Sequence, residues 1–302
     1  MMVIYYQNTS RYFLKIACNL IDRICSLKTL VKHNSNQIAK KGLDHILAPE
    51  PNIIDVLFGR GKEKVINSES LIEEVKDRVL KSLSGEPIYA AVTEESEEFL
   101  RKRVLQSMEM GILFIDLVGS TSLILKLPKE QLATVFTTFA QEMAYVVKRH
   151  DGYVLKFVGD AVIGYFVAEE LSSSVANKIV TCAESMLKVL KLGINPILKD
   201  RNLPELEVRI GLDYGENTIV RYGDDPQEAH VDILGPSVSM AAKLQNFAFP
   251  DQIVIGGDVY SRLYDSIKEY FVELELDEKQ WNYRSTKTGK TYSAFAYLGK
   301  NP

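Results

Sequence analysis

Gly111-Ile112-Leu113-Phe114-Ile115-Asp116-Leu117-Val118-Gly119-Ser120-Thr121 is the stretch around which this 302-residue sequence is organised. The apolar run before Asp116 is typical of a buried strand, and the small residues after it can begin a helix with free N–H groups. Those amides attract an anion, whereas the carboxylate of Asp116 repels it. A cation bound together with a polyphosphate satisfies both groups. A strand that ends on Asp as a simple helix cap explains the same residues, so a second carboxylate is needed.

A second carboxylate, Asp160, lies in the segment Lys156-Phe157-Val158-Gly159-Asp160. The segments Tyr153 to Phe157 and Ala161 to Val167 are predicted to be strands joined by a turn at this acid. A helix that ends before His150-Asp151-Gly152 separates the two acids in sequence. Its apolar residues recur at helical spacing: Leu132, Val135, Phe136, Phe139, Met143, Val146 and Val147.

A second helix over Ser172 to Leu192 and a strand over Leu206 to Tyr214 complete a β-α-β-β-α-β order. This order predicts an α+β, ferredoxin-like domain whose sheet contains antiparallel strands. In that topology the third strand lies between the first and the second, so Asp116 and Asp160 share one edge of the sheet. Two carboxylates there can bind one or two divalent cations on a polyphosphate, which favours phosphoryl-transfer chemistry.

Four motifs resemble, in order and spacing, those of the class III nucleotidyl cyclases. They are Phe114-Ile115-Asp116-Leu117-Val118-Gly119-Ser120-Thr121, Lys156-x-x-Gly159-Asp160-Ala161, Arg209-x-Gly211-x-x-x-Gly215 and Asp232-Ile233-x-Gly235-x-x-Val238-x-x-Ala241-Ala242. Each motif alone is weak, but four in order are specific. The resemblance begins near Met108, so residues 108–302 are expected to be the catalytic domain. Residues 1–107 are then a helical region for regulation or dimerisation.

The resemblance implies an adenylate cyclase, a lyase that converts ATP into 3′,5′-cyclic AMP and pyrophosphate at a homodimer interface. Two Mg²⁺ or Mn²⁺ ions per site are expected, held by Asp116, Asp160 and the backbone carbonyl of Leu117. Phosphate is expected to bind the amides of the following loop: Val118, Gly119, Ser120 and Thr121. Arg209 would reach the terminal phosphates, although a structural salt bridge explains a strand arginine equally well.

By the same resemblance, Lys156 and Asp232 read the base from the opposite protomer, with Ile233 beside them. A lysine donates to adenine N1 and a carboxylate accepts from the N6 amino group. Guanine presents the reverse pattern and leaves both groups unpaired, so ATP is the favoured substrate.

Two positions depart from the family pattern. Seven and eleven residues after Asp232 the family has Asn and Arg, which orient the ribose and stabilise the reacting phosphate, whereas this sequence has Ser239 and Lys243. Losing one such donor typically lowers turnover by about 100- to 1000-fold, although Lys243 keeps the charge. A slower or differently tuned enzyme is the favoured interpretation. A degenerate ATP-binding regulatory module and a cyclase for another nucleotide are the alternatives.

The region before the first catalytic strand is predicted to be helical. Ser70-Leu71-Ile72-Glu73 resembles a capping box that opens a helix, and Glu94 to Gln106 is predicted to form another helix. The first helix is expected to carry on one face the apolar residues Leu71, Val75, Val79, Leu80 and Leu83. Phe13 to Val31 has the pattern of a basic amphipathic helix. Packing on protein is favoured for this helix over peripheral contact with an anionic membrane.

Composition excludes several classes of function. A net charge of −4 offers no electrostatic case for binding nucleic acid. No stretch has the pattern of a transmembrane segment or a signal peptide, and three cysteines without a metal pattern suit a reducing cytoplasm. These are Cys18, Cys25 and Cys182, which are expected to be packing residues. A solvated hairpin is favoured over phosphate contact for Lys287 and Lys290.

Overall fold

The computed structural model describes residues 67–86, 92–168, 172–277, 279, 281–285 and 288–299. The centre of its sheet has the strand order β2-β3-β1-β4, with every neighbouring pair antiparallel. These strands are β1 (Ser107–Leu117), β2 (Tyr153–Val158), β3 (Ala161–Val167) and β4 (Val208–Tyr222). The third strand therefore lies between the first and the second, and the predicted ferredoxin-like order is confirmed.

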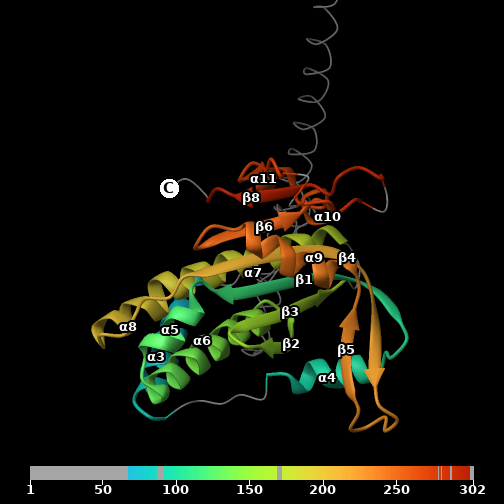
Figure 1. The fold of residues 1–302 in the computed structure, drawn as a ribbon. Helices are drawn as coiled ribbons and strands as arrows, with labels where there is room; N and C mark the ends of the chain where they lie inside the picture. Colours follow the sequence, from blue (N-terminus) through green and yellow to red (C-terminus); the bar gives the residue numbers. More distant parts are fainter. Residues whose placement is uncertain are drawn as a thin grey trace, which may run out of the picture. The chain divides into compact units, whose positions relative to one another are not determined.

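The sheet continues beyond β4 with β6 (Gln252–Gly256), β8 (Ala294–Tyr297) and β7 (Phe271–Glu273). β6 runs parallel to β4, and β8 and β7 follow antiparallel. The far end of β4 pairs with β5 (His230–Leu234), and we call residues 218–234 the β4–β5 arm. Figure 1 shows this arm turning away from the sheet toward α4. β5 was not predicted from the sequence.

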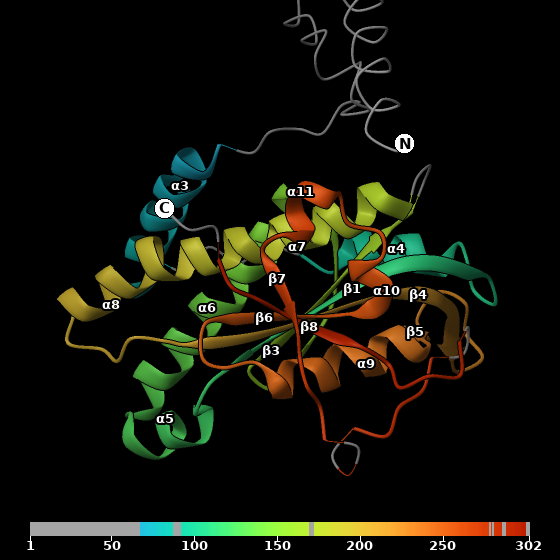
Figure 2. The same ribbon diagram turned by 90° about the horizontal axis from the view of Figure 1, so that it is seen from above.

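Helices cover both faces of the sheet, and Figure 2 shows α7 and α9 on opposite sides. The main apolar core lies under α3 (Ser68–Leu83), α6 (Lys129–Arg149) and α7 (Ser172–Val189). A second core lies under α4 (Glu94–Arg101) and α9 (Pro236–Leu244). α9 can sit directly on β4 because of Gly211, where a Cβ atom would lie 2.0 Å from the carbonyl oxygen of Ala241.

Short elements connect these layers. They are α5 (Ser120–Lys126), the π-helical turn η1 (Leu190–Ile194), α8 (Asn195–Asp200), the 3₁₀ turn η2 (Gln245–Phe247), α10 (Gly257–Tyr260) and α11 (Asp265–Lys268). A third apolar cluster forms around the buried Trp281. The indole of this residue donates a hydrogen bond of 2.6 Å to the carbonyl of Tyr292.

The predicted start of α3 is wrong by three residues, since the helix begins at Ser68 and its N-cap is Asn67 rather than Ser70. The side chain of Asn67 caps it by accepting from the amides of Glu69 and Ser70. The Ser70 hydroxyl instead donates to Glu74, four residues later, so no capping box forms. The predicted apolar face is confirmed for Leu71, Val75 and Val79, which are buried, whereas Leu80 is exposed.

Both α3 and α4 lie within the predicted N-terminal region and pack on the sheet and its helices. On α3, the Nε of Arg78 donates to both carboxylate oxygens of the buried Glu142 on α6, at 3.0 Å each. α4 ends at Arg101, five residues before its predicted end, and the chain turns into β1 through Leu105, whose φ is 66°.

Several predictions fall on residues outside the described part of the chain: the helix over Phe13 to Val31, Cys18, Cys25 and Lys287. Cys182 is buried in the main core, which confirms it as a packing residue. Within the described residues, no helix combines the length and apolar character that crossing a bilayer requires.

Candidate active site

The fold brings Asp116 and Asp160 together. Asp116 lies near the end of β1, and Asp160 lies in the β2–β3 turn, where Gly159 has a φ of 63° that favours glycine. The pKa of Asp116 is raised to about 6, first by burial and then by the negative charge of Asp160 and a hydrogen bond between the two side chains. The Leu117 amide and the charge of Arg209 act in the opposite direction. The pair is therefore under electrostatic repulsion.

Arg209 stands directly opposite Asp116 in the β1–β4 register. The Nε atom of Arg209 is buried without a hydrogen-bond partner, and so is the Oδ2 atom of Asp160. Within the described part of the chain Arg209 forms no close ion pair, so the structural salt bridge considered from the sequence is not present. Buried polar atoms without partners are rare in native proteins and mark places where a ligand completes the bonding.

A divalent cation fits this carboxylate pair. Carboxylate oxygens are the ligands that Mg²⁺ and Mn²⁺ prefer, and a cation between the two acids would relieve their repulsion. The described residues contain no group of three or more His, Cys, Asp or Glu side chains placed to hold a metal. Other ligands would have to come from the backbone, water or a bound substrate, as is usual for Mg²⁺ bound with phosphates.

The loop after β1 is only partly available to a phosphate. Gly119 has a φ of 68° and starts α5, so the amides of Ser120 and Thr121 lie in the first helical turn without acceptors in the helix. The amide of Val118, however, donates to the carbonyl of Glu207 at 2.8 Å. The predicted phosphate contact of Val118 is therefore blocked in this structure, because its amide already has a partner.

Lys156 on β2 and Asp232 on β5 form an ion pair, with 2.5 Å between Nζ and Oδ2. The other carboxylate oxygen, Oδ1, accepts from the amide of Ile233 at 2.9 Å. Nε2 of His230 lies 3.8 Å from Oδ2. The two residues expected to read the base are thus adjacent in one chain. Ile233 itself is buried in the second core, so its backbone rather than its side chain supports the pair.

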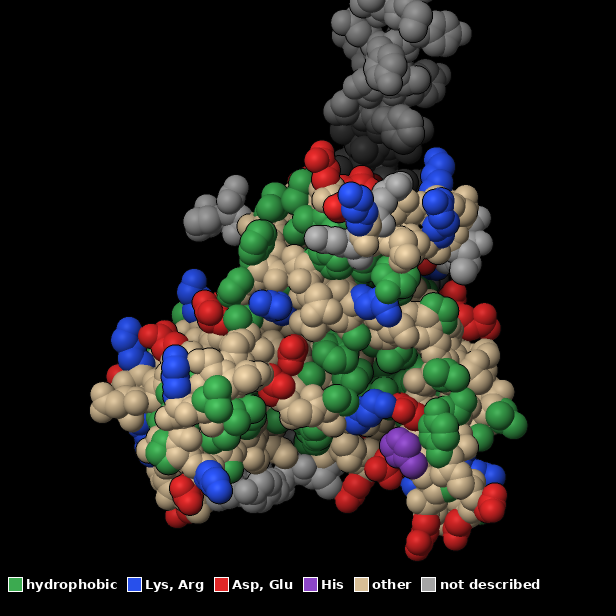
Figure 3. Space-filling view, in the orientation of Figure 1, with side chains coloured by type: hydrophobic (Ala, Val, Ile, Leu, Met, Phe, Trp, Pro, Cys, Tyr) green, Lys and Arg blue, Asp and Glu red, His purple; other side chains and the backbone are tan. Residues whose placement is uncertain are grey.

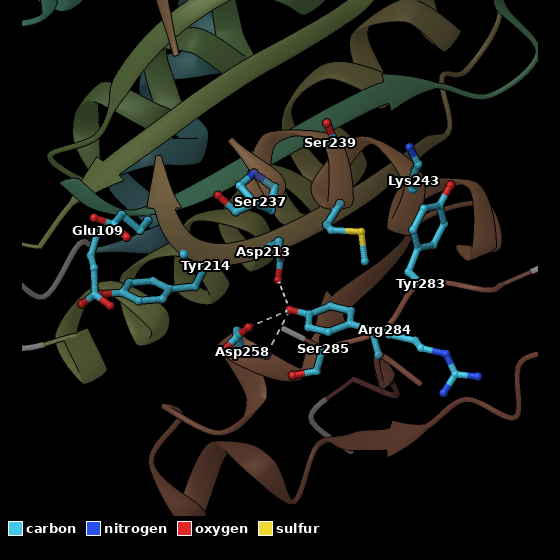
Figure 4. Close-up of a pocket in the computed structure, with 15 residues that line it drawn as sticks. Glu109, Asp213, Tyr214, Ser237, Ser239, Lys243, Asp258, Tyr283, Arg284 and Ser285 are labelled. Carbon is cyan, nitrogen blue, oxygen red and sulfur yellow. Dashed lines mark hydrogen bonds between the residues drawn. The ribbon is translucent and has the colours of Figure 1, made fainter. Parts of the chain in front are cut away.

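Ser239 and Lys243 lie on α9 and line a cavity of about 590 Å³. Figure 4 shows both side chains extending from α9 away from Asp213, on the same side of the helix. The Nζ of Lys243 lies 4.9 Å from the centroid of the Tyr283 ring, a cation–π contact. Ser239 and Lys243 therefore lie on one face of α9.

The floor of the same cavity is a polar cluster that sequence reasoning missed. The Tyr292 hydroxyl donates to the buried carboxylate of Asp213 at 2.6 Å and lies 3.4 Å from Asp258. Burial, followed by the charge of Asp213, raises the pKa of Tyr292 far above its usual value. No local sequence signal links these residues, because the sheet brings them together from distant segments.

The predicted site residues therefore form three separate groups in one chain. These are the carboxylate pair with Arg209, the Lys156–Asp232 pair, and Ser239 with Lys243 on the cavity wall. Among the described contacts, no hydrogen bond or ion pair joins one group to another.

The hairpin residue Lys290 is exposed, consistent with solvation. Figure 3 shows acidic side chains gathered at the tip of the β4–β5 arm, contributed by Asp224, Asp225 and Glu228.

Comparisons with known proteins place this arrangement in a family. The sequence profile described as "Adenylate and Guanylate cyclase catalytic domain" matches residues 104–292. A cytidylate cyclase of Escherichia coli is 31% identical over 163 residues, which cover 52% of this chain and 36% of that protein. A cytidylate cyclase of Staphylococcus aureus is 27% identical over 169 residues, covering 55% and 40% respectively. The chain spans less than half the length of these curated relatives.

The fold is also found among solved structures. The crystal structure of the adenylyl cyclase CyaB from P. aeruginosa is similar with a TM-score of 0.54 and 22% sequence identity. The similarity covers 65% of this chain and 96% of that chain. At this identity the similarity supports the fold.

Proposed function

The chain belongs to the family of adenylate and guanylate cyclase catalytic domains, and on this premise we propose that it is an active nucleotidyl cyclase. It would convert a nucleoside triphosphate into the 3′,5′-cyclic nucleotide and pyrophosphate. The observation that carries the proposal is the carboxylate pair, in which Asp116 and Asp160 repel each other beside buried polar atoms that lack partners. If this pair had only a structural role, the repulsion between its carboxylates would lower the stability of the folded chain and serve no function.

In this proposal Asp116, Asp160 and the Leu117 carbonyl hold Mg²⁺ or Mn²⁺. The ions would supply acidification of the ribose 3′-hydroxyl and neutralisation of the leaving pyrophosphate. Arg209, whose Nε is free, would bind the terminal phosphates, and the amides from Gly119 to Thr121 would complete the phosphate contacts.

The Lys156–Asp232 pair is proposed to select the base. A lysine donor and a carboxylate acceptor complement an edge that carries a ring nitrogen acceptor beside an amino group. Adenine presents this edge at N1 and N6, and cytosine presents it at N3 and N4. Guanine and uracil carry the reverse pattern and would leave both protein groups unpaired. The proposed substrate class is therefore a nucleotide with an amino base.

ATP and CTP both meet this requirement. ATP is the substrate expected from the sequence motifs. CTP is the second candidate because the Escherichia coli and Staphylococcus aureus relatives are named cytidylate cyclases. The two bases share the hydrogen-bonding edge and differ in ring size, so a direct comparison of turnover separates them.

A site shared by two protomers accounts for the separation of the three groups. The carboxylates and Arg209 of one chain would face Lys156 and Asp232 of a second copy, with Ser239 and Lys243 of that copy near the reacting phosphate. Ser239 keeps a hydroxyl and Lys243 keeps a charge, so the altered positions are proposed to slow the reaction without abolishing it.

The test is incubation of the purified full chain with ATP, CTP, GTP or UTP and Mg²⁺ or Mn²⁺, followed by mass spectrometry of the products. We expect a cyclic product from ATP or CTP, at least about 100-fold slower turnover of GTP and UTP, and loss of activity with a chelator. Binding of ATP or CTP without any cyclic product would overturn the proposal in favour of a regulatory nucleotide-binding module.

A further inference from the structure

The helix that precedes the catalytic strands lies between the two strands that carry the proposed base readers. α4 contacts β2, which carries Lys156, and β5, which carries Asp232. Figure 1 shows α4 beside the β4–β5 arm. These two strands are not neighbours in the sheet. The helix is therefore a direct physical connection between them.

The core contact of α4 involves the sequence neighbours of both base readers. Leu100 of α4 is fully buried in the second core. The same apolar cluster contains Leu155, which precedes Lys156, and both Val231 and Ile233, which flank Asp232. Leu100 therefore packs in one close-packed cluster with sequence neighbours of both base readers, and such interiors transmit small displacements.

Aromatic contacts fix α4 to the start of β2. The ring of Phe99 lies 4.9 Å from that of Tyr153, which in turn stacks on Tyr165 at 5.1 Å. The buried hydroxyl of Ser96 donates to the Tyr165 hydroxyl at 3.1 Å. One side of α4 is thus attached to the β2–β3 hairpin.

Arg101 attaches the other side of α4 to the β4–β5 arm. One guanidinium nitrogen donates to the carbonyl of Ala229 at 2.7 Å and to that of Pro226 at 3.3 Å. Ala229 immediately precedes His230, whose ring lies 3.8 Å from the Asp232 carboxylate. The planar guanidinium holds two carbonyls of the turn at once, which fixes where β5 begins.

We propose that Arg101 is a positioning residue for base selection, which sets the distance between Asp232 and Lys156 by anchoring the β4–β5 arm to α4. The proposal rests on the proposed function, in which these two side chains read the base. In the proposed site Arg101 would contact neither the base nor the phosphates, because its guanidinium binds the carbonyls of Pro226 and Ala229. Its loss should therefore alter discrimination between bases more than the maximal rate.

The experiment compares Arg101→Ala with Lys102→Ala in the full chain. Lys102→Ala is the matched control, since it removes the same charge from the next position. Among the described residues, the Lys102 ammonium pairs only with the exposed Glu98, at 2.5 Å. The values of kcat and KM are measured for ATP, CTP, GTP and UTP, and circular dichroism verifies folding. We expect Arg101→Ala to reduce the preference for amino bases, expressed in kcat/KM, by about 10- to 100-fold, mainly through KM. Lys102→Ala should leave the preference unchanged, and Arg101→Lys should restore part of it.

An unchanged preference in Arg101→Ala, or an equal loss in Lys102→Ala, would overturn the inference. Binding of 3′-deoxynucleoside triphosphates, which lack the attacking hydroxyl, gives a second readout that needs no turnover. If the wild-type chain makes no cyclic product, the proposed function fails, while the ratio of Kd values for these analogues still tests the role of Arg101. Should Arg101→Ala fail to fold, Arg101→Met, which keeps the apolar stem but has no donor for the two carbonyls, provides the same comparison.

Discussion

The Asp116–Asp160 pair and the Lys156–Asp232 pair are built on opposite electrostatic principles. Each joins two charged side chains from distant segments of the chain. The first pair combines like charges, and polar atoms of Asp160 and of the adjacent Arg209 are buried without partners. The second pair combines opposite charges in direct contact. In the proposed function a cation would complete the first pair, whereas the second pair is already satisfied and would exchange partners when a base binds.

This difference predicts opposite effects of mutation on stability. Removing one of two like charges relieves repulsion, whereas removing one member of an ion pair leaves the other charge without compensation. Activity and stability should therefore change in opposite directions at the carboxylate pair and in the same direction at the base-reading pair.

The largest effect is expected at the carboxylates. Asp116→Ala and Asp160→Ala should each lower kcat by about 1000-fold or more, since several kcal/mol of charge stabilisation depend on the ions that they hold. The melting temperature of the metal-free protein should stay equal or rise. Steady-state kinetics with Mn²⁺ and thermal unfolding with a chelator are the measurements. Metal-dependent activity that persists in either variant would remove these two acids from the metal site.

The next effect concerns the opposite-charge pair. Lys156→Met and Asp232→Leu should each reduce kcat/KM on the preferred nucleotide by about 100-fold, through loss of a base-specific hydrogen bond. Each should also lower the free energy of unfolding by about 1–2 kcal/mol, because one charge loses its partner. The double variant should be destabilised by less than the sum of the two, as urea unfolding would show. Additive destabilisation would mean that the 2.5 Å contact contributes nothing in solution.

Restoring the family residues on α9 should have a smaller effect. Ser239→Asn with Lys243→Arg should raise kcat on ATP, or on CTP if that is the substrate, by about tenfold, with little change in KM. Both groups would act where charge develops rather than where the nucleotide is anchored. The gain of the double variant should exceed the product of the single gains. Loss of activity would instead assign Ser239 and Lys243 to a different arrangement suited to this cavity.

The smallest effect is a pH dependence of stability. The pKa of Asp116 is raised from 3.8 to about 6, so between these values the folded chain holds a proton that the unfolded chain releases. The stability of the metal-free protein should therefore fall as pH rises from about 4 to about 6. After allowance for partial exposure, the fall attributable to Asp116 is about 1 kcal/mol. Asp116→Asn should abolish it in urea titrations with a chelator, and an unaltered pH profile in that variant would contradict the assignment.

Much of the fold was predictable because its central signals are local. Apolar runs and helical spacing indicated the strands and helices around Asp116 and Asp160, and their order was enough to bring the two acids to one sheet edge. The strand β5 was missed because His230 to Leu234 is short and its pairing depends on the extended end of β4. The cap of α3 was misplaced because Asn67 and Ser70 are both plausible caps, and only the backbone geometry distinguishes them.

The site was predictable only in part. The joint assignment of Lys156 and Asp232 as base readers came from resemblance to a family, but their direct contact was not predicted. The two residues are 76 positions apart, and no spacing rule joins them. The partner of the Val118 amide and the Asp213–Tyr292 contact are long-range hydrogen bonds that no local pattern encodes. The anchoring of the β4–β5 arm by Arg101 is of the same kind, because its acceptors are backbone carbonyls more than 100 positions away.

The most direct test of the account is complementation between the two pairs. Asp116→Ala and Lys156→Ala chains, each nearly inactive alone, are mixed under conditions that allow protomers to exchange. In a shared site, each heterodimer has one site with both mutations and one with neither. Random exchange then predicts recovery of about a quarter of wild-type activity, since half of the dimers are mixed and each has one intact site. Heterodimers that form and stay inactive would contradict the account, because the carboxylates and the base readers would then act within a single chain.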